Sequence, residues 1–138
     1  MGRGPVAQFV IDSSALLEIF TGTSVDPLLR RRVLTQTGGA PELVDIEVAN
    51  GLRRMVVRGL LSPPVALGVF RDIRDAPMNR APHRPLLERI WELRGAITLY
   101  DATYVALAEQ LEVPLVTCDA KLAGSNGHGA RIELYPRS

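Results

Sequence analysis

Four acidic residues, spread along a chain of 138, have the side chains best suited to act together: Asp12, Glu47, Asp101 and Asp119. Carboxylates brought together repel one another, so without compensation at least one of them takes up a proton. A divalent cation removes this conflict, and oxygen-rich sites select hard ions such as Mg²⁺ or Mn²⁺. Such an ion lowers the pKa of a bound water and stabilises negative charge on a phosphate under attack. If these four acids meet, we expect metal-assisted hydrolysis of a phosphate ester.

Two of these acids, Asp12 and Asp119, directly follow short apolar runs. The runs Val6–Ile11 and Leu115–Cys118 contain several β-branched residues, which predicts two buried strands. Ligands of open α/β sheets bind at the carboxyl ends of the parallel strands. The two aspartates should therefore lie close together although they are far apart in the chain. Ser13 and Thr117, next to these strand ends, are candidates for side chains that support the acids.

Glu47 lies on the longest predicted helix, at about residues 42–60. On a helical wheel, Val44, Val48, Leu52, Met55 and Val56 share one face, and Glu47, Asn50, Arg54 and Arg58 share the opposite one. Asp45 falls toward the apolar face. Glu47 is therefore free to point into a cleft.

The other predicted elements place these residues in one α/β domain, at residues 1–138. Asp101 opens a helix at about 101–111, where exposed N–H groups favour a negative charge. Further helices are predicted at 13–20, 27–36, 65–74 and 84–94, with one helical turn at 120–123; Gly38 and Gly39 end the second of these helices. An edge strand or an extended connector at 76–82 and a last strand at 131–135 complete the pattern. Strands alternating with helices predict an α/β sandwich around a mostly parallel sheet.

Bulk properties set limits on the function. The formal net charge is +1, so any binding of nucleic acid must depend on a local basic patch. Cys118 is the only cysteine, which excludes an internal disulfide and favours an intracellular, cytoplasmic protein. No apolar run is long enough to span a membrane.

Each acid also has a purely structural interpretation. Asp12, Asp101 and Asp119 could cap the amino ends of helices. Glu47 could pair with Arg54 or Arg58 on a solvated face. Cys118 and Trp91 are expected in the core. Spacing alone leaves these interpretations open beside the catalytic one.

Four segments of the chain resemble the motifs of PIN-domain nucleases. VIDSSAL at 10–16 resembles the opening motif, and APELVDIEVANGLR at 40–53 resembles the second acidic motif. LYDATYVALA at 99–108 and PLVTCDAKL at 114–122 resemble the third and fourth. All four motifs occur in order and span nearly the whole chain. Their sequences are most similar to those of VapC-like toxins of type II toxin–antitoxin pairs.

This resemblance implies a three-layer α/β/α sandwich with Mg²⁺- or Mn²⁺-dependent endoribonuclease activity. A metal-activated water would leave a 5′-phosphate and a 3′-hydroxyl. The four acids match the family acids, and Thr117 matches the family's hydroxyl position two residues before the last acid. Arg54 and Arg58, on the face of Glu47, are our own candidates for contact with RNA phosphates. The resemblance further implies a homodimer and a cognate antitoxin whose tail blocks the active site.

Other α/β classes fit the pattern less well. A response-regulator receiver domain would need adjacent acids after the first strand, where Ser13 and Ser14 stand, and a haloacid-dehalogenase-like phosphatase would need Asp in place of Ser14. A non-catalytic interaction domain has little reason to tolerate four repelling acids. A housekeeping PIN nuclease in RNA maturation has the same motifs as a toxin, so that alternative stays open.

Overall fold

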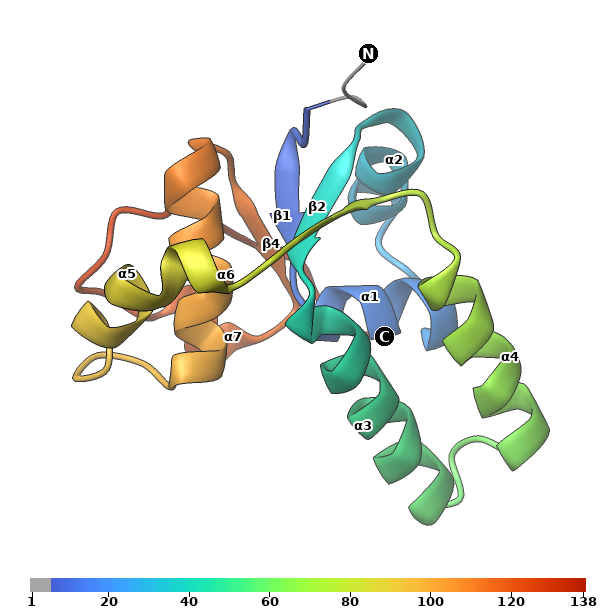
Figure 1. Ribbon diagram of the computed structural model, residues 1–138. Coiled ribbons are helices and arrows are strands. Elements are labelled where there is room, and N and C mark those ends of the chain that lie inside the picture. The colour runs from blue at the N-terminus through green and yellow to red at the C-terminus, as the bar shows by residue number, and fades with distance from the viewer. Residues whose placement is uncertain (1–5) are drawn as a thin grey trace, which may run out of the picture.

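The computed structural model describes residues 6–138 and shows a five-stranded, all-parallel sheet at the centre of the chain (Figure 1). The strand order is β3-β2-β1-β4-β5. The strands are β1 (Phe9–Ile11), β2 (Gly38–Pro41), β3 (Asn79–Ala81), β4 (Leu115–Thr117) and β5 (Ile132–Leu134). The predicted sheet is confirmed, and it is parallel throughout.

Helices cover both faces of this sheet, as a three-layer α/β/α sandwich requires. They are α1 (Ser13–Thr21), α2 (Pro27–Thr35), α3 (Leu43–Val57), α4 (Pro63–Arg74), the 3₁₀ turn η1 (Arg84–Leu86), α5 (Leu87–Glu92), α6 (Leu99–Leu111) and α7 (Ala120–Ala123). Helices α5 and α6 lie on one side of the sheet and α1 and α2 on the other, while α3 and α4 form a hairpin beyond the sheet's lower edge (Figure 1).

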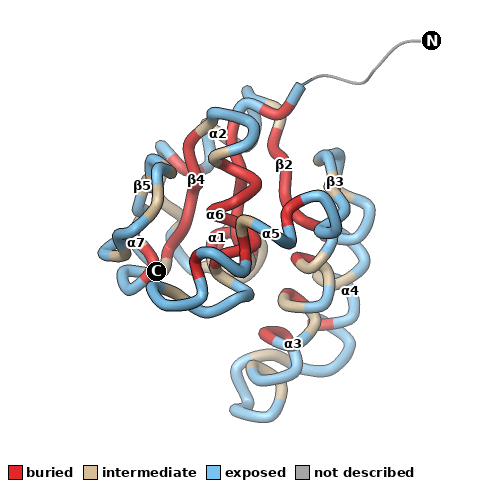
Figure 2. The backbone as a smooth tube through the Cα atoms, turned by 60° about the vertical axis from the view of Figure 1, so that its left-hand side comes forward, coloured by how far each residue is buried: buried red, intermediate tan, exposed pale blue. Residues whose placement is uncertain are grey.

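The core lies where β1, β4 and α6 meet. All residues of β1 and β4 are buried, and so is the run from Ala102 to Ala108 of α6 (Figure 2). This explains why α6 has small and apolar residues around its whole circumference, since it is enclosed on all sides. The α3–α4 hairpin has one buried face and exposed ends (Figure 2).

The sequence analysis missed strand β2. We interpreted Gly38 and Gly39 as the stop of a helix, yet both are buried and pair in parallel with β1. A Cβ at Gly38 would lie 2.9 Å from the Phe9 ring, and one at Gly39 would lie 2.9 Å from the Ala7 Cβ. Side chains of the neighbouring strand thus occupy the space that side chains of β2 would need, and glycine is the residue that allows this packing.

Trp91 is a second correction, because its side chain is 59% exposed rather than in the core. The predicted helix at 84–94 is a 3₁₀ turn followed by the six residues of α5. In this segment Leu86, Ile90 and Leu93 are buried in place of Trp91. Trp91 points outward, and the guanidinium of Arg94 lies 4.5 Å from the centre of its ring. Cys118 is buried as expected. Within residues 6–138, no helix is long and apolar enough to cross a membrane.

Candidate active site

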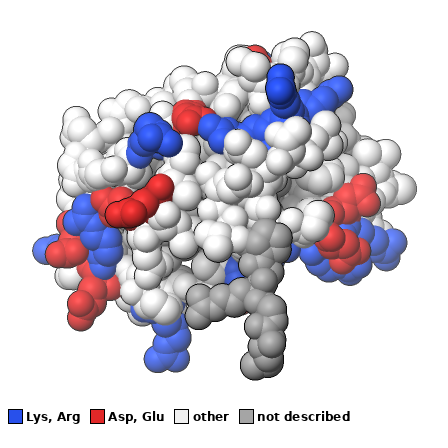
Figure 3. Space-filling model, turned by 90° about the horizontal axis from the view of Figure 1, so that it is seen from above, with Lys and Arg blue, Asp and Glu red and all other residues white. Residues whose placement is uncertain are grey.

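The carboxyl ends of β1, β2 and β4 meet at one edge of the sheet. Asp12 and Asp119 come just after β1 and β4 at this edge, and Asp101 lies in the first turn of α6. Helix α1 begins beside Asp12, α3 follows β2, and α7 begins beside Asp119 (Figure 1). Figure 3, which looks onto the opposite edge, shows basic and acidic side chains mixed on that face. The acids therefore gather where parallel α/β sheets bind ligands.

Asp12 is the most buried of the four, with 6% of its surface exposed. Its Oδ1 accepts hydrogen bonds from the Ala15 backbone N–H (3.0 Å) and the Ser14 hydroxyl (2.7 Å). Its Oδ2 accepts one from the Thr117 hydroxyl. Asp12 thus caps α1, as the structural interpretation held, and at the same time faces β4. Capping and membership of the acidic cluster are compatible.

Thr117 and Ser14 join the two strand ends that carry Asp12 and Asp119. The Thr117 hydroxyl accepts from the Asp119 N–H (2.9 Å), and the Ser14 hydroxyl accepts from the Cys118 N–H (3.0 Å). The expectation for Thr117 agrees with these contacts. The serine that reaches Asp12 is Ser14, however, and not Ser13, which we had favoured. Both belong to the first turn of α1, so sequence spacing alone did not separate them.

Glu47 approaches the cluster from α3 and is held by α6. The Tyr104 hydroxyl donates to Glu47 Oε1 at 2.6 Å. The alternative pairing with Arg54 or Arg58 is absent from the ion pairs within residues 6–138. Asp45, expected near the apolar face, is half-buried and forms a salt bridge with Arg80 of β3. Sequence analysis did not find Tyr104, because a tyrosine inside an apolar helix is typical of core packing.

Asp101 lies in the first turn of α6, but Thr98 caps that helix by accepting from the Asp101 N–H (3.1 Å). The Asp101 carboxylate is therefore left to face the cluster. Asp119 caps the short α7 through the Lys121 N–H (2.9 Å).

The four acids are electrostatically coupled. Burial raises the pKa of Asp12 above its ordinary value, and the charge of Asp119 adds to this rise. Burial also raises the pKa of Asp101, again with Asp119 contributing. For Glu47, burial raises the pKa first, and the charges of Asp101 and Asp12 raise it further. Each of these shifts means that the ionised cluster is unfavourable without a positive partner. Burial likewise raises the pKa of the Cys118 thiol to about 11, so this cysteine is not a thiolate nucleophile at neutral pH.

The donor chemistry of this cluster fits a hard divalent cation. Its ligands would be carboxylate oxygens, which Mg²⁺ and Mn²⁺ prefer, and such an ion would offset the burial and the repulsion that together raise the three pKa values. In the part of the chain that the structure describes, no three Asp, Glu, His or Cys side chains are close enough to enclose an ion on their own. Mg²⁺ does not require such a group, because one or two carboxylates usually hold it and waters complete its coordination.

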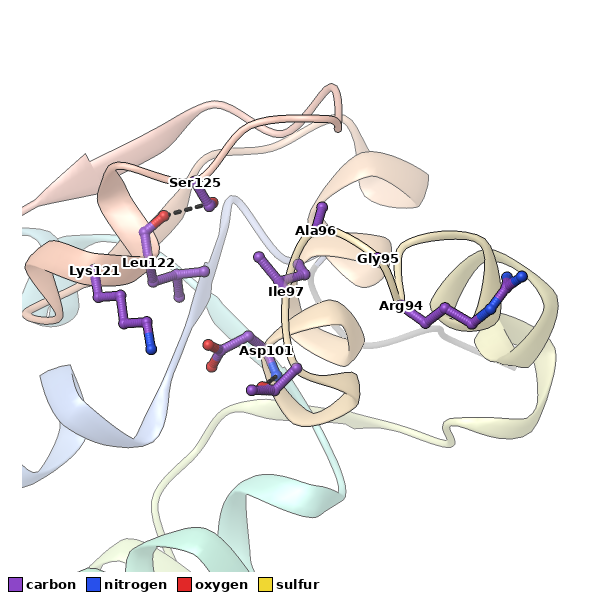
Figure 4. A pocket seen from close by; sticks show the side chains of 9 residues that line it. Arg94, Gly95, Ala96, Ile97, Asp101, Lys121, Leu122 and Ser125 are labelled. Carbon is purple, nitrogen blue, oxygen red and sulfur yellow. Dashed lines mark hydrogen bonds between the residues drawn. The ribbon is translucent and has the colours of Figure 1, made fainter.

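A cavity of about 440 Å³ opens beside the cluster, bordered by Asp101 and Lys121. Figure 4 shows the Asp101 carboxylate and the Lys121 amine pointing into the space between α6 and α7, whereas the Arg94 side chain points away from it. Lys121 is the only lysine of the chain. The cavity thus places one cation opposite an acid at the edge of the site.

Comparisons with known proteins identify relatives that match most of this chain. The family model described as "PIN domain" matches residues 9–124. The chain is 42% identical to Ribonuclease VapC12 of Mycobacterium tuberculosis over 125 residues. This aligned region covers 91% of this chain and 97% of that protein. The crystal structure of PAE2754 from Pyrobaculum aerophilum superposes with a TM-score of 0.70 at 22% identity, covering 92% of this chain and 84% of that one. The structure of VapBC2 from Rickettsia felis, bound to a DNA fragment from its promoter, gives a TM-score of 0.66 at 12% identity, with 92% and 98% covered.

Proposed function

The chain belongs to the PIN-domain family and has VapC ribonucleases among its relatives, and we propose that it is a divalent-metal-dependent endoribonuclease acting as the toxin of a type II toxin–antitoxin pair. The observation that carries the proposal is the coupling of Asp12, Glu47, Asp101 and Asp119 at the carboxyl edge of the sheet. A purely structural set of helix caps would not need this mutual repulsion.

In this proposal the four acids are the catalytic residues and would hold Mg²⁺ or Mn²⁺. When bound, the ion would activate water and stabilise negative charge on the phosphate. The protein's own part is to position the ligands. Thr117 and Ser14 hold Asp12 and order the turn that carries Asp119, while Tyr104 holds Glu47. Partners of this kind fix the orientation of metal-ligating carboxylates.

RNA is the proposed substrate, with cleavage leaving a 5′-phosphate and a 3′-hydroxyl. Arg54 supports this role, because it lies close enough to Glu47 to lower the pKa of that carboxyl. Arg58 follows one turn later on the same helix. Arginine is well suited to phosphate because its guanidinium presents several donors in a fixed fork.

The VapBC toxin–antitoxin proteins among the structural neighbours support an antitoxin as partner. We propose a cognate antitoxin that covers the site, a homodimer as the form in solution, and action in the cytoplasm as one domain at residues 1–138. A protomer has a mass of 15.1 kDa, so light scattering from the purified toxin should report about twice this value.

The direct test compares RNA cleavage by the wild type and Asp101→Asn in Mn²⁺, with a structured RNA as substrate. Glu42→Gln serves as the control, because Glu42 is an exposed acid at the start of α3. We expect Asp101→Asn to lose on the order of a hundredfold in rate or more, and chelation by EDTA to abolish the activity of both wild type and control. Cleavage by Asp101→Asn at the wild-type rate would overturn the assignment of the site.

A further inference from the structure

A second cleft, of about 300 Å³, shares no lining residue with the Asp101 cavity. It is formed between α1, α3 and residues 137–138. Three arginines border it: Arg54, Arg58 and Arg137. Sequence analysis had singled out the first two from the helical wheel, but Arg137 is far from them in the chain and carried no signal.

Arg137 is held in place by contacts of its own segment. Its Nε donates to the Cys118 carbonyl at 3.1 Å. The next residue, Ser138, donates to the Glu18 carboxylate through its N–H (3.1 Å) and its hydroxyl (2.6 Å). Glu18 is only 6% exposed. Figure 1 shows this end of the chain lying beside α1. The segment is therefore anchored to α1 and to the turn before Asp119.

The side chains that line the cleft carry an excess of positive charge. Elsewhere the structure pairs arginines with carboxylates, as in Arg80 with Asp45 and Arg89 with Glu109. Neither Arg54, Arg58 nor Arg137 forms an ion pair with any of the residues 6–138. Glu18 is the only acidic side chain among the lining residues, so one carboxylate stands against three guanidinium groups, and Ser138 donates hydrogen bonds to that carboxylate. Three guanidinium groups thus face the cleft with donors to spare.

This cleft reaches the acidic cluster through Ser14. Ser14 borders the cleft, and its hydroxyl donates to Asp12 at 2.7 Å. The acidic cluster thus borders the arginine cleft at Ser14, beside Asp12, and the other cavity at Asp101. A nucleic acid strand that has one phosphate at the acids could place its neighbouring phosphates in the cleft.

We propose that the cleft of Arg54, Arg58 and Arg137 binds the phosphates of the RNA strand that flank the cleaved bond. The inference rests on the proposed ribonuclease function and assigns the substrate backbone to one side of its site. Arg137 is the residue that tests this proposal. Its side chain donates to the Cys118 carbonyl, and Glu18 anchors the next residue, Ser138, so that Arg137 completes the cleft. The occupant is a nucleic acid backbone, because three guanidinium groups without ion pairs to residues 6–138, gathered in one cleft, suit phosphates.

The test measures binding of a labelled single-stranded RNA in EDTA, where cleavage does not interfere, across about 50 to 200 mM salt. We compare wild type, Arg137→Ala and Arg137→Lys. The control is Arg131→Ala, which removes an exposed arginine at the opposite edge of the sheet, next to β5. Loss of one phosphate contact should reduce the slope of log K against log salt by about 0.7 in Arg137→Ala. Arg137→Lys and Arg131→Ala should keep the wild-type slope.

The outcomes separate this inference from the proposed function. Wild-type cleavage together with an unchanged slope in Arg137→Ala would overturn the cleft and leave the ribonuclease intact. Weakened binding of the antitoxin with unchanged binding of RNA would also overturn it, and would make the cleft a surface for an acidic protein. A wild type that neither binds nor cleaves RNA would refute both. Melting curves check that Arg137→Ala is folded, as its exposed side chain leads us to expect.

Discussion

The hydroxyl of Tyr104 donates a hydrogen bond of 2.6 Å to the carboxylate of Glu47 and so joins α6 to α3. Tyr104 is 1% exposed, and its pKa is raised far above its ordinary value, first by burial and then by the charge of Glu47. The tyrosine is therefore a protonated donor throughout the physiological range. It holds an acid from outside the sheet against the acids at the strand ends.

Tyr104→Phe should shift the pH dependence of RNA cleavage. The hydrogen bond from Tyr104 lowers the pKa of Glu47, so its loss raises a pKa that burial has already raised. If the ionised carboxylate is the active form, the acid limb of the pH–rate profile moves to higher pH. We also expect a loss of about 1 kcal/mol in the free energy of unfolding. Tyr100→Phe, an exposed tyrosine of the same helix, is the control. Superimposable profiles of Tyr104→Phe and wild type would argue against this role.

Without metal, the acidic cluster should make stability depend on pH. The folded-state pKa values of Asp12, Glu47 and Asp101 are raised, so the stability linked to their protonation is fully present below the unfolded values of about 4. It is lost as the pH rises through the folded values. In EDTA, Asp101→Asn should therefore gain melting temperature relative to wild type as the pH rises from about 4 toward neutrality.

Addition of Mn²⁺ should reverse that order, because an ion that binds only the folded form stabilises it. At about 100 times its Kd, the ion would add about 2.7 kcal/mol to the free energy of unfolding of the wild type. Asp101→Asn should gain much less. A difference between the two melting temperatures that depends on neither pH nor Mn²⁺ would show that the cluster is not a cation site.

Thr117→Val tests the hydrogen bonds that connect the carboxyl ends of β1 and β4. Thr117 is fully buried, and its hydroxyl donates to Asp12 and accepts from the Asp119 N–H. Valine has the same shape but leaves these buried groups without a partner, which should cost about 1 to 3 kcal/mol. Cleavage should fall together with stability, since both aspartates lose an orienting contact. Thr117→Ser keeps the hydroxyl and should retain most of the activity; urea denaturation and initial rates measure the two effects. Equal behaviour of Val and Ser would contradict the role of the hydroxyl.

The acids could be predicted from the sequence because each stands at a place that local rules define. Asp12 and Asp119 follow apolar strands, and Glu47 lies opposite the apolar stripe of its helix. The residues that support these acids could not be predicted from such local rules. Tyr104 belongs to a helix that is apolar on all sides, and its use as a donor depends on α3 packing nearby. Arg137 acquires its position only through Glu18 and Cys118, which are distant in the chain.

The same limit explains the errors in the fold. The Gly38–Pro41 segment has low β propensity, and it is a strand because β1 and β3 pair with both of its edges. Trp91 was expected in the core from its size alone. Short helix α5 has room to bury one face only, and that face is formed by Ile90 together with Leu86 and Leu93 at its two ends. Tertiary contacts decide both cases, and a single sequence does not contain them.

The adjacent residues Ser13 and Ser14 provide a matched pair for the last prediction. The Ser14 hydroxyl donates to Asp12 and accepts from the Cys118 N–H. Ser14→Ala leaves that N–H without its partner and raises the pKa of Asp12 further, because the bond from Ser14 lowers it. We expect a loss of about 1 to 3 kcal/mol in stability and a lower cleavage rate, most marked at acid pH.

Ser13→Ala changes the same atoms one position earlier and should leave both quantities close to those of the wild type. Melting curves and initial rates on the two variants, measured side by side, make the comparison. If Ser13→Ala were the more damaging change, the hydrogen bonds that place Asp12 would be wrongly assigned. The support of the acidic cluster would then have to come from the first residue of α1 and not from the second.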